Sequence, residues 1–287
     1  MKELRHLSLL EANFSGRIPH SLGNLTNLQH LDVSLNVLYA DDVNWVSQLS
    51  SLQHLDMSGV YLGKALNLFH VLGKLPSLQE VWLMNCCLNK LHRPRQLVST
   101  TNLSRVQVLY LTYNELETPI LDAFQNMTSI RELDLAYNDF SSVPSWISKF
   151  KKLEGLGLAN NMLHSPFPDA LRNMTQMKIL DLSQNNLVVA PSWLAELKSL
   201  AYLYLAGNKL SSQISVLPFL RKLCHLKILD LSRNKIQGEA FAGNLSNLRT
   251  LLLRQNHLNG TIPNSFGQLE NLSYLDLSYN KLVGVFP

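Results

Sequence analysis

An eleven-residue pattern, L-x-x-L-x-L-x-x-N-x-L, recurs along the entire chain and constrains its fold more than any other feature of the sequence. The pattern starts twelve times, at Leu4, Leu28, Leu52, Leu78, Val106, Ile130, Leu153, Met177, Leu200, Leu226, Leu248 and Leu272. Consecutive starts lie 22 to 28 residues apart. A recurring period of this length indicates a solenoid, in which each repeat packs only against its neighbours.

The central part of each repeat has the alternation of a β-strand. The leucines at its fourth and sixth positions point to one side, and the variable residues point to the other. One repeat cannot bury its leucines alone, so successive strands stack in parallel, about 4.8 Å apart. We therefore expect an α/β fold, a right-handed solenoid of about twelve repeats, with a parallel sheet on the concave face and short helices and 3-10 turns on the convex side. We expect a single array over residues 1–287, with both ends inside a repeat.

The ninth position of the pattern is asparagine in nine repeats: Asn36, Asn114, Asn138, Asn161, Asn185, Asn208, Asn234, Asn256 and Asn280. A short amide there can bond the backbone where the chain turns away from the strand. Cys86 fills this position in the fourth repeat, while Ala12 and Val60 break it. We therefore expect the first and third repeats to turn differently.

The second half of each repeat forms the outer wall. Ser145 and Ser192 each follow a proline, which predicts a helix N-cap at these serines. Trp45, Trp146 and Trp193 each lie seven residues before the next repeat, so we expect them to pack on the outer wall.

Composition excludes several classes of protein. The cysteines, Cys86, Cys87 and Cys224, make no disulfide framework, and we expect buried free thiols. The net charge of +4 is scattered, which is not typical of a nucleic-acid binder. No apolar run approaches the ~18 residues of a membrane span, so we expect no membrane segment in this chain.

Several repeats extend the pattern to L-x-x-N-x-L-x-G-x-I-P-x-x-L-G-x-L, most clearly in residues 14–25 and 258–269. This extension resembles the plant extracellular class of leucine-rich repeats. Residues 41–52 and 223–226 resemble plant receptor-like proteins of the group that includes the fungal xylanase receptors. The resemblance implies an internal ectodomain fragment on the extracellular side of the plasma membrane. Its membrane anchor would lie outside this chain, and a membrane receptor kinase would be its signalling partner.

The sugar-acceptor pattern N-x-[ST] occurs at Asn13, Asn24, Asn102, Asn126, Asn173, Asn244, Asn259 and Asn271. Five of these sites lie four residues before the first leucine of a repeat, so sugars there would leave the inner sheet free. We therefore predict glycosylation. The alternative is that this class of repeat carries Asn-Leu-Thr or Asn-Leu-Ser there for structural reasons.

Solenoids usually bind their ligands on the concave sheet, which is formed here by the third, fifth, seventh and eighth residues of each repeat. Aromatic and arginine side chains carry binding energy at interfaces. The candidate ligand-binding residues on this face are Trp82, Met84, Tyr110, Tyr113, Tyr137, Tyr202, Tyr204, Arg233, Leu252 and Arg254, and Tyr274 and Tyr279 share its columns. The alternative is that exposed aromatics simply favour strands.

Other residues of this face have more modest interpretations. The fifth-position aspartates are expected to be solvated edge residues without a catalytic role: Asp32, Asp56, Asp134, Asp181, Asp230 and Asp276. Gly155 and Gly157 leave the seventh repeat without side chains at its third and fifth positions.

Residues 89–95 form a basic loop that either binds an acidic sugar or peptide or is merely solvated.

His6, His30 and His54 share the third position of three successive repeats and should stack along the sheet. Neighbouring positive charges resist joint protonation, while Asp32 and Asp56 favour it. The hypothesis is a pH-sensitive column of histidines. The alternative is that Leu-Gln-His-Leu-Asp is common repeat sequence without a functional role.

The sequence lacks nucleophile motifs, phosphate loops and metal-ligand spacings, and its polar residues recur with the repeat instead of converging on one site. We therefore expect a binding module, with no enzyme activity, no cofactor and no metal. The leading prediction is a receptor ectodomain for defence or development signalling that binds an extracellular peptide, protein or glycan. One alternative is a secreted inhibitor of cell-wall-degrading enzymes, of the polygalacturonase-inhibitor type. Another is a nonfunctional fragment of a duplicated receptor gene.

Overall fold

The computed structural model describes residues 1, 3–91, 102–165, 167, 169–211, 222–239, 245–262 and 264–284. The chain divides into two compact units, an N-terminal unit, Met1–Phe140, and a C-terminal unit, Ser141–Pro287. The single array over residues 1–287 remains a prediction.

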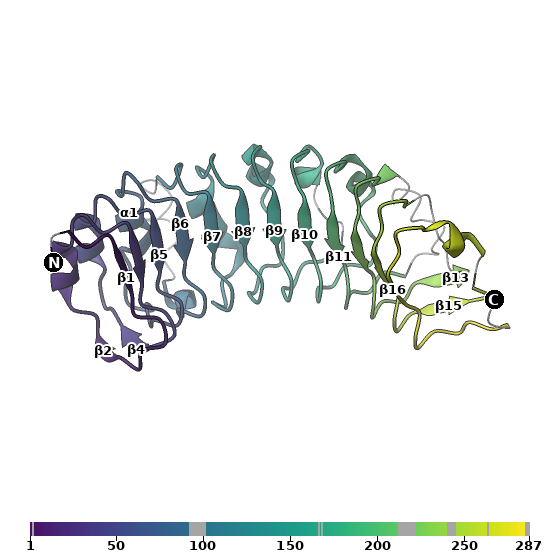
Figure 1. Ribbon diagram of the computed structural model, residues 1–287, viewed down its shortest axis with the longest axis horizontal. Helices are drawn as coiled ribbons and strands as arrows, with labels where there is room; N and C mark the ends of the chain where they lie inside the picture. Colours follow the sequence, from purple (N-terminus) through teal and green to yellow (C-terminus); the bar gives the residue numbers. More distant parts are fainter. Residues whose placement is uncertain are drawn as a thin grey trace. The chain divides into compact units, whose positions relative to one another are not determined.

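The described part of each unit contains a parallel sheet of short strands, one from each repeat (Figure 1). In the N-terminal unit the strands are β1 (His6–Ser8), β3 (His30–Asp32), β5 (His54–Asp56), β6 (Glu80–Trp82), β7 (Val108–Tyr110) and β8 (Glu132–Asp134). In the C-terminal unit they are β9 (Gly155–Gly157), β10 (Ile179–Asp181), β11 (Tyr202–Tyr204), β12 (Ile228–Asp230), β14 (Thr250–Leu252) and β16 (Tyr274–Asp276).

The register of these sheets follows the repeat. Each strand comprises the third to fifth residues of its repeat, and equal positions pair across strands, as His6 does with His30 and Leu7 with Leu31. The leucines at the fourth and sixth positions are almost all buried. The predicted leucine-rich-repeat solenoid fold is confirmed.

Two smaller parallel sheets lie outside the main ones, where the G-x-I-P step or its equivalent extends the repeat. They pair β2 (Ser15–Arg17) with β4 (Val37–Tyr39), and β13 (Gln237–Glu239) with β15 (His257–Asn259). In both sheets, the twelfth to fourteenth residues of one repeat pair with the tenth to twelfth residues of the next, so backbone groups of the extension bond between repeats.

The outer wall is built mainly of short 3-10 helices. In the described residues the 3-10 helices are η1 (His20–Asn24), η2 (Asn44–Gln48), η3 (Leu88–Lys90), η4 (Thr118–Phe124), η5 (Ser145–Lys149), η6 (Asp169–Leu171), η7 (Ser192–Glu196) and η10 (Asn264–Gln268). The same wall contains the α-helix α1 (Leu68–Leu72). Trp45 and Trp193 are buried here, as predicted, whereas Trp146 is half-buried with its ring edge-on to Phe150.

The N-cap prediction for the two serines was wrong. Pro144 and Pro191 occupy the cap positions of η5 and η7, and the serines are the first helical residues. The reason is the tight i→i+3 turn: the carbonyl of Pro144 already accepts the first helical bond, from Ile147 N at 3.2 Å.

The ninth-position asparagines form the polar ladder that the sequence predicts. Asn138 is typical: its Nδ2 donates to the carbonyl of Leu111 in the preceding repeat at 2.9 Å and to those of Leu135 and Ala136 in its own turn. Its Oδ1 accepts bonds from the backbone N–H groups of Asn114 and Leu116, at 3.2 and 2.9 Å. One buried side chain thereby satisfies five backbone groups in two adjacent repeats.

Cys86 takes over part of this role, because its Sγ donates to the carbonyls of Met57 and Met84 at 3.2 and 3.5 Å. Burial raises the pKa of Cys86 to about 12, which keeps the thiol protonated as a donor. The prediction of three buried thiols was wrong for the other two cysteines, since Cys87 is half-buried and Cys224 is exposed. Neither residue occupies the ninth, ladder position of its repeat.

The two repeats without a ninth-position Asn or Cys behave differently from each other. The backbone N–H of Ala12 donates to Asn36 Oδ1 at 3.1 Å, as in repeats that have the asparagine, and the expectation of a different turn there stays a prediction. The acceptor comes from the following repeat, and a residue's own side chain is not needed for it. Val60 instead closes its own turn, with its N–H on the carbonyl of Met57 at 3.0 Å.

The eighth residue of every repeat has a positive φ, which the sequence did not reveal. These residues are Glu11, Leu35, Gly59, Asn85, Tyr113, Tyr137, Asn160, Gln184, Gly207, Arg233, Gln255 and Tyr279. The left-handed conformation ends the strand and turns the ninth residue inward, at a cost of about 1–2 kcal/mol for a non-glycine residue.

The interpretation of the fifth-position aspartates as merely solvated edge residues was wrong. Each accepts a hydrogen bond from the backbone N–H two residues later, as Asp56 does from Ser58 at 2.8 Å and Asp181 from Ser183 at 2.9 Å. Asp56 is itself buried. This local bond closes the turn that leads from the strand to the left-handed residue.

Candidate ligand-binding surface

The face of each sheet that carries the third and fifth residues of the repeats is called the sheet face. In the N-terminal unit, five of its side chains form a continuous aromatic row: His6, His30, His54, Trp82 and Tyr110. The imidazoles stack with ring centroids 4.1 and 4.2 Å apart. The ring of Trp82 meets His54 edge-on at 5.0 Å and stacks on Tyr110 at 5.4 Å. The parallel register creates the histidine stack and the stack of Trp82 on Tyr110, because it pairs equal positions of adjacent repeats. The contact of His54 with Trp82 instead joins the third position of one repeat to the fifth position of the next.

Two glutamates hold the row in place. His54 Nδ1 lies 2.9 Å from Glu80 Oε2, and the Tyr110 hydroxyl donates to Glu132 Oε2 at 2.8 Å. Burial raises the pKa of Tyr110, and the bond to Glu132 raises it further, so the phenol stays protonated as a donor. These contacts order the aromatic side chains before any ligand arrives, which lowers the entropic cost of binding.

The histidine stack that the sequence predicts is present, whereas its pH-sensing role remains a hypothesis. Burial lowers the pKa of His30, and the flanking His54 and His6 lower it further, while Asp32 and Glu80 oppose this shift. The pKa of His30 therefore lies below its usual value, which disfavours protonation of this ring.

Three more candidates of the N-terminal unit lie near the row. Tyr113 and Tyr137 stack with ring centroids 4.0 Å apart, both at left-handed eighth positions. They are 54% and 43% exposed, which places them among the most accessible aromatics of the described chain. Met84 is half-buried at the seventh position next to Trp82.

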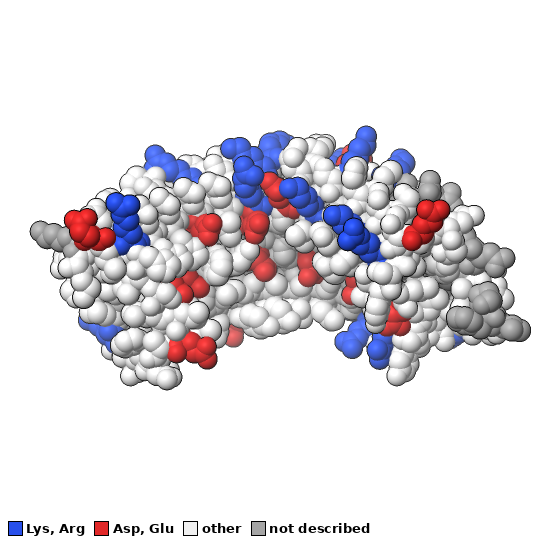
Figure 2. Space-filling model, in the orientation of Figure 1, with Lys and Arg blue, Asp and Glu red and all other residues white. Residues whose placement is uncertain are grey.

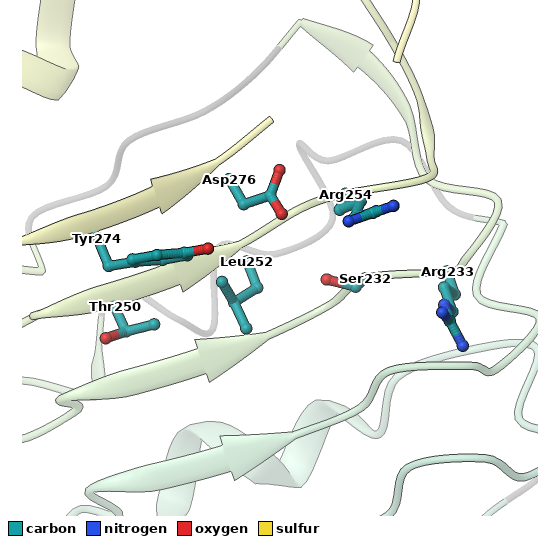
Figure 3. A pocket seen from close by; sticks show the side chains of 7 residues that line it. All are labelled: Ser232, Arg233, Thr250, Leu252, Arg254, Tyr274 and Asp276. Atoms are coloured by element: carbon teal, nitrogen blue, oxygen red, sulfur yellow. The ribbon is translucent and has the colours of Figure 1, made fainter. Parts of the chain in front are cut away.

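The C-terminal unit carries a different arrangement, a shallow pocket of about 580 Å³ on its sheet face (Figure 3). The pocket is lined by Ser232, Arg233, Thr250, Leu252, Arg254, Tyr274 and Asp276. The Arg254 guanidinium lies 4.6 Å from the centroid of the Tyr279 ring, and Arg233 Nε donates to Gln255 Oε1 at 3.0 Å. Within the described residues, neither arginine has a carboxylate ion-pair partner.

The structure brings Arg233, Leu252 and Arg254 together, but not with Tyr202 and Tyr204, which do not line this pocket. Burial raises the pKa of Tyr204, and Asp181 and Tyr202 raise it further. Sequence reasoning missed Ser232 and Thr250 as pocket residues, although they occupy the same third and seventh columns. Their small side chains line the pocket between larger neighbours. Only the three-dimensional arrangement reveals that these side chains share one pocket.

The side chains of seven predicted sugar acceptors can be located, and all are exposed: Asn13, Asn24, Asn102, Asn126, Asn173, Asn259 and Asn271. Asn244 and the loop residues 92–95 lie outside the described residues. Asn271 Nδ2 already donates to the Ser246 carbonyl at 2.6 Å. Glycosylation at these sites remains a prediction.

A second pocket that the sequence did not predict, of about 600 Å³, lies beside β4 in the N-terminal unit. Its lining includes Tyr39, Tyr61 and Lys64.

In the parts of the chain that the structure describes, no cluster of three or more His, Cys, Asp or Glu is suited to a metal ion. The same residues include no helix with the length and apolar character needed to traverse a bilayer.

Comparison with known proteins identifies the repeats. A family model described as leucine rich repeat matches residues 76–140, 144–210 and 224–282, more than half of the chain. The chain is 36% identical over 143 residues to Receptor-like protein EIX1 of Solanum lycopersicum, which covers 49% of this chain and 14% of that relative. It is 42% identical over 71 residues to Receptor-like protein 9a of Arabidopsis thaliana, covering 24% and 8%. The matched segments are thus small parts of these relatives.

Solved structures show the same fold. PEPR1 with AtPEP1 has a TM-score of 0.74 at 29% identity and covers 99% of this chain and 39% of its own. The Arabidopsis receptor kinase HAESA, in complex with the peptide hormone IDA and the co-receptor SERK1, has a TM-score of 0.67 at 28% identity, covering 93% and 48%. The chain is homologous to plant receptor-like proteins, and it belongs to the leucine-rich repeat family.

Proposed function

We propose that this chain is a ligand-recognition part of a plant cell-surface receptor-like protein and that it binds an extracellular peptide, protein or glycan on its sheet face. It supplies binding without catalysis, and its place is the extracellular side of the plasma membrane. The observation that carries this proposal is the aromatic row, in which Trp82 and Tyr110 are accessible and yet held by neighbouring rings and by Glu132.

The ordering of these side chains favours a binding role over a purely structural one. The leucine core and, in most repeats, the asparagine ladder already stabilise the fold without the aromatic side chains of the row. Large aromatic side chains that are ordered at a surface lose little entropy when a partner covers them. The row therefore has the properties of a binding hot spot.

The pocket of the C-terminal unit extends the proposed recognition surface. Tyr274 and Leu252 offer apolar contacts, and the guanidinium of Arg254 can donate two parallel hydrogen bonds to a carboxylate. A ligand of the C-terminal unit would thus combine an apolar group with an acidic one.

The partners follow from the relatives. The HAESA structure includes a peptide hormone and a co-receptor, and by homology we propose a membrane receptor kinase as signalling partner of this chain. A role in defence or development signalling belongs to the same proposal.

The test is a direct binding measurement with the secreted, glycosylated chain against a panel of peptides, microbial proteins and cell-wall glycan fragments. For a ligand that binds the row, we expect the double substitution Trp82→Ala with Tyr110→Ala to weaken affinity by about a hundredfold or more. Tyr39→Ala is the matched control, because Tyr39 is an exposed tyrosine on β4, away from the sheet face.

Thermal unfolding must show that both variants remain folded. Equal affinity of the double variant and the wild type would remove the row from the binding site. A folded chain that binds no member of the panel would contradict the proposal.

A further inference from the structure

One edge of the C-terminal unit carries unpaired positive charge. The second residue of each repeat stands directly before the strand, and its backbone bonds to its equivalent in the next repeat, as Arg249 N does to the Lys227 carbonyl at 2.8 Å. These bonds align the second residues in one column: Glu154, Lys178, Ala201, Lys227, Arg249 and Ser273. The residues of one column therefore project from the same edge of the sheet.

The basic edge consists of three cations of this column and two from the turns that precede the strands: Lys152, Lys178, Lys198, Lys227 and Arg249. All five are exposed, and blue side chains cross this part of the C-terminal unit in Figure 2. Lys178 Nζ pairs with Glu154 at 2.6 Å.

The nearby carboxylates leave most of this charge uncompensated. Glu196 pairs with Arg172, at 3.5 Å, and Glu270 lies two residues before the last repeat. Among the described residues, Lys152, Lys198, Lys227 and Arg249 have no ion-pair partner. The edge therefore presents a run of free cations.

The same column of the N-terminal unit has four glutamines in succession, which shows that the fold does not require a cation there. It runs Arg5, Gln29, Gln53, Gln79, Gln107 and Arg131, and Gln107 Nε2 donates to Gln79 Oε1 at 3.4 Å. The backbone bonds are equivalent, as Gln53 N donates to the Gln29 carbonyl at 2.8 Å. The lysines and the arginine in the column of the C-terminal unit are therefore not required by the repeat fold.

We propose that the basic edge binds a linear acidic polysaccharide with a carboxylate on each sugar, at a surface separate from the sheet face. A line of cations that follows the strand spacing matches a polymer whose negative charges also recur along a line. Lysine is a compact, hydrated point charge that tolerates varied geometry, which suits a flexible uronate chain better than a single oriented anion.

The chemistry of the edge disfavours a nucleic acid. Single-stranded nucleic acids bind where aromatic side chains stack on the bases, and the basic edge itself contains none. An anionic membrane surface would use the same cations, so it is included as an arm of the test.

The experiment measures binding of the full chain to polygalacturonate of defined length, at physiological ionic strength. The edge variant combines Lys178→Gln, Lys227→Gln and Arg249→Gln, the residue type at four of the six equivalent positions of the N-terminal unit. The control variant combines Lys209→Gln, Lys235→Gln and Lys281→Gln, three exposed cations that follow the ladder asparagines at the opposite end of the strands. Both variants remove the same charge.

We expect the edge variant to weaken binding about tenfold and the control variant less than about twofold. Binding should also weaken as salt rises, because screening shortens the reach of exposed charges. Fully methyl-esterified polymer should not bind.

Equal losses in the two variants would overturn the proposal, because they would indicate attraction by net charge alone. Equal binding of the methyl-esterified polymer would overturn it as well. Binding to anionic phospholipid vesicles without binding to polygalacturonate would replace the polysaccharide with a membrane surface. Far-ultraviolet circular dichroism confirms that the variants are folded.

Discussion

The two compact units share one backbone pattern and differ in what they display on it. Residues 1–140 contain ten Lys and Arg and thirteen Asp and Glu, a net charge of −3, whereas residues 141–287 contain fifteen and eight, a net charge of +7. The sheet face of the N-terminal unit carries a packed aromatic row, and that of the C-terminal unit carries a pocket with two arginines that lack carboxylate partners among the described residues.

This contrast shows that stability and recognition occupy different positions of the repeat. The fourth, sixth and ninth residues build the core and ladder in both units, while the second, third, fifth and seventh vary with little effect on the backbone. A repeat fold can therefore change its surface chemistry between neighbouring segments, because each repeat depends structurally only on its neighbours.

The largest effect is expected where the two units are equivalent. Asn138→Ala in the N-terminal unit and Asn208→Ala in the C-terminal unit each leave buried backbone groups without partners, at a cost of about 3–5 kcal/mol. Urea unfolding measures the loss. Lys209→Ala, on an exposed neighbour, should change stability by less than about 0.5 kcal/mol. A loss confined to one unit would break the equivalence of the two ladders.

A smaller, opposite effect is expected at the left-handed eighth positions. Leu35 is 61% exposed with φ +53°, so Leu35→Gly relieves backbone strain and should raise the free energy of unfolding by about 1 kcal/mol. Val37→Gly is the matched control, since Val37 is also exposed, at 79%, but lies in the extended strand β4, where glycine should lower stability by about 0.5–1 kcal/mol. If both substitutions destabilise the chain equally, the left-handed turn stores no strain.

The smallest effect is a pH dependence specific to the N-terminal unit. His30 has a pKa below its unfolded value of 6.5, so the native state binds fewer protons and stability falls as the pH drops through about 6.5. His30→Gln should reduce the drop in melting temperature between pH 7.5 and pH 5, as measured by calorimetry. His20→Gln, at an exposed histidine outside the stack, is the comparison variant. An identical drop in the His30 variant would rule out the stack as its source.

Most of the aromatic row was predictable from sequence, but the contact between His54 and Trp82 was not, because it joins the third position of one repeat to the fifth position of the next. Because parallel strands pair equal repeat positions, the columns that contain the histidines, Trp82 and Tyr110 follow from counting. The same counting places Arg233, Leu252 and Arg254 on one face. Their convergence with Ser232 and Thr250 into a pocket was not predictable, because it depends on side-chain sizes and directions in three adjacent repeats.

The sequence by itself determined the repeat, the strand register, the buried leucines and the asparagine ladder, since each follows from a periodic pattern that only one packing can bury. Tertiary structure alone decided the left-handed conformation of the eighth residues, the capping by Asp56 and its equivalents, the proline caps of η5 and η7, and the glutamates that hold His54 and Tyr110. These features depend on backbone turns and on contacts between residues about 22 to 28 positions apart, where the amino-acid types permit several partners and the packing of neighbouring repeats selects one.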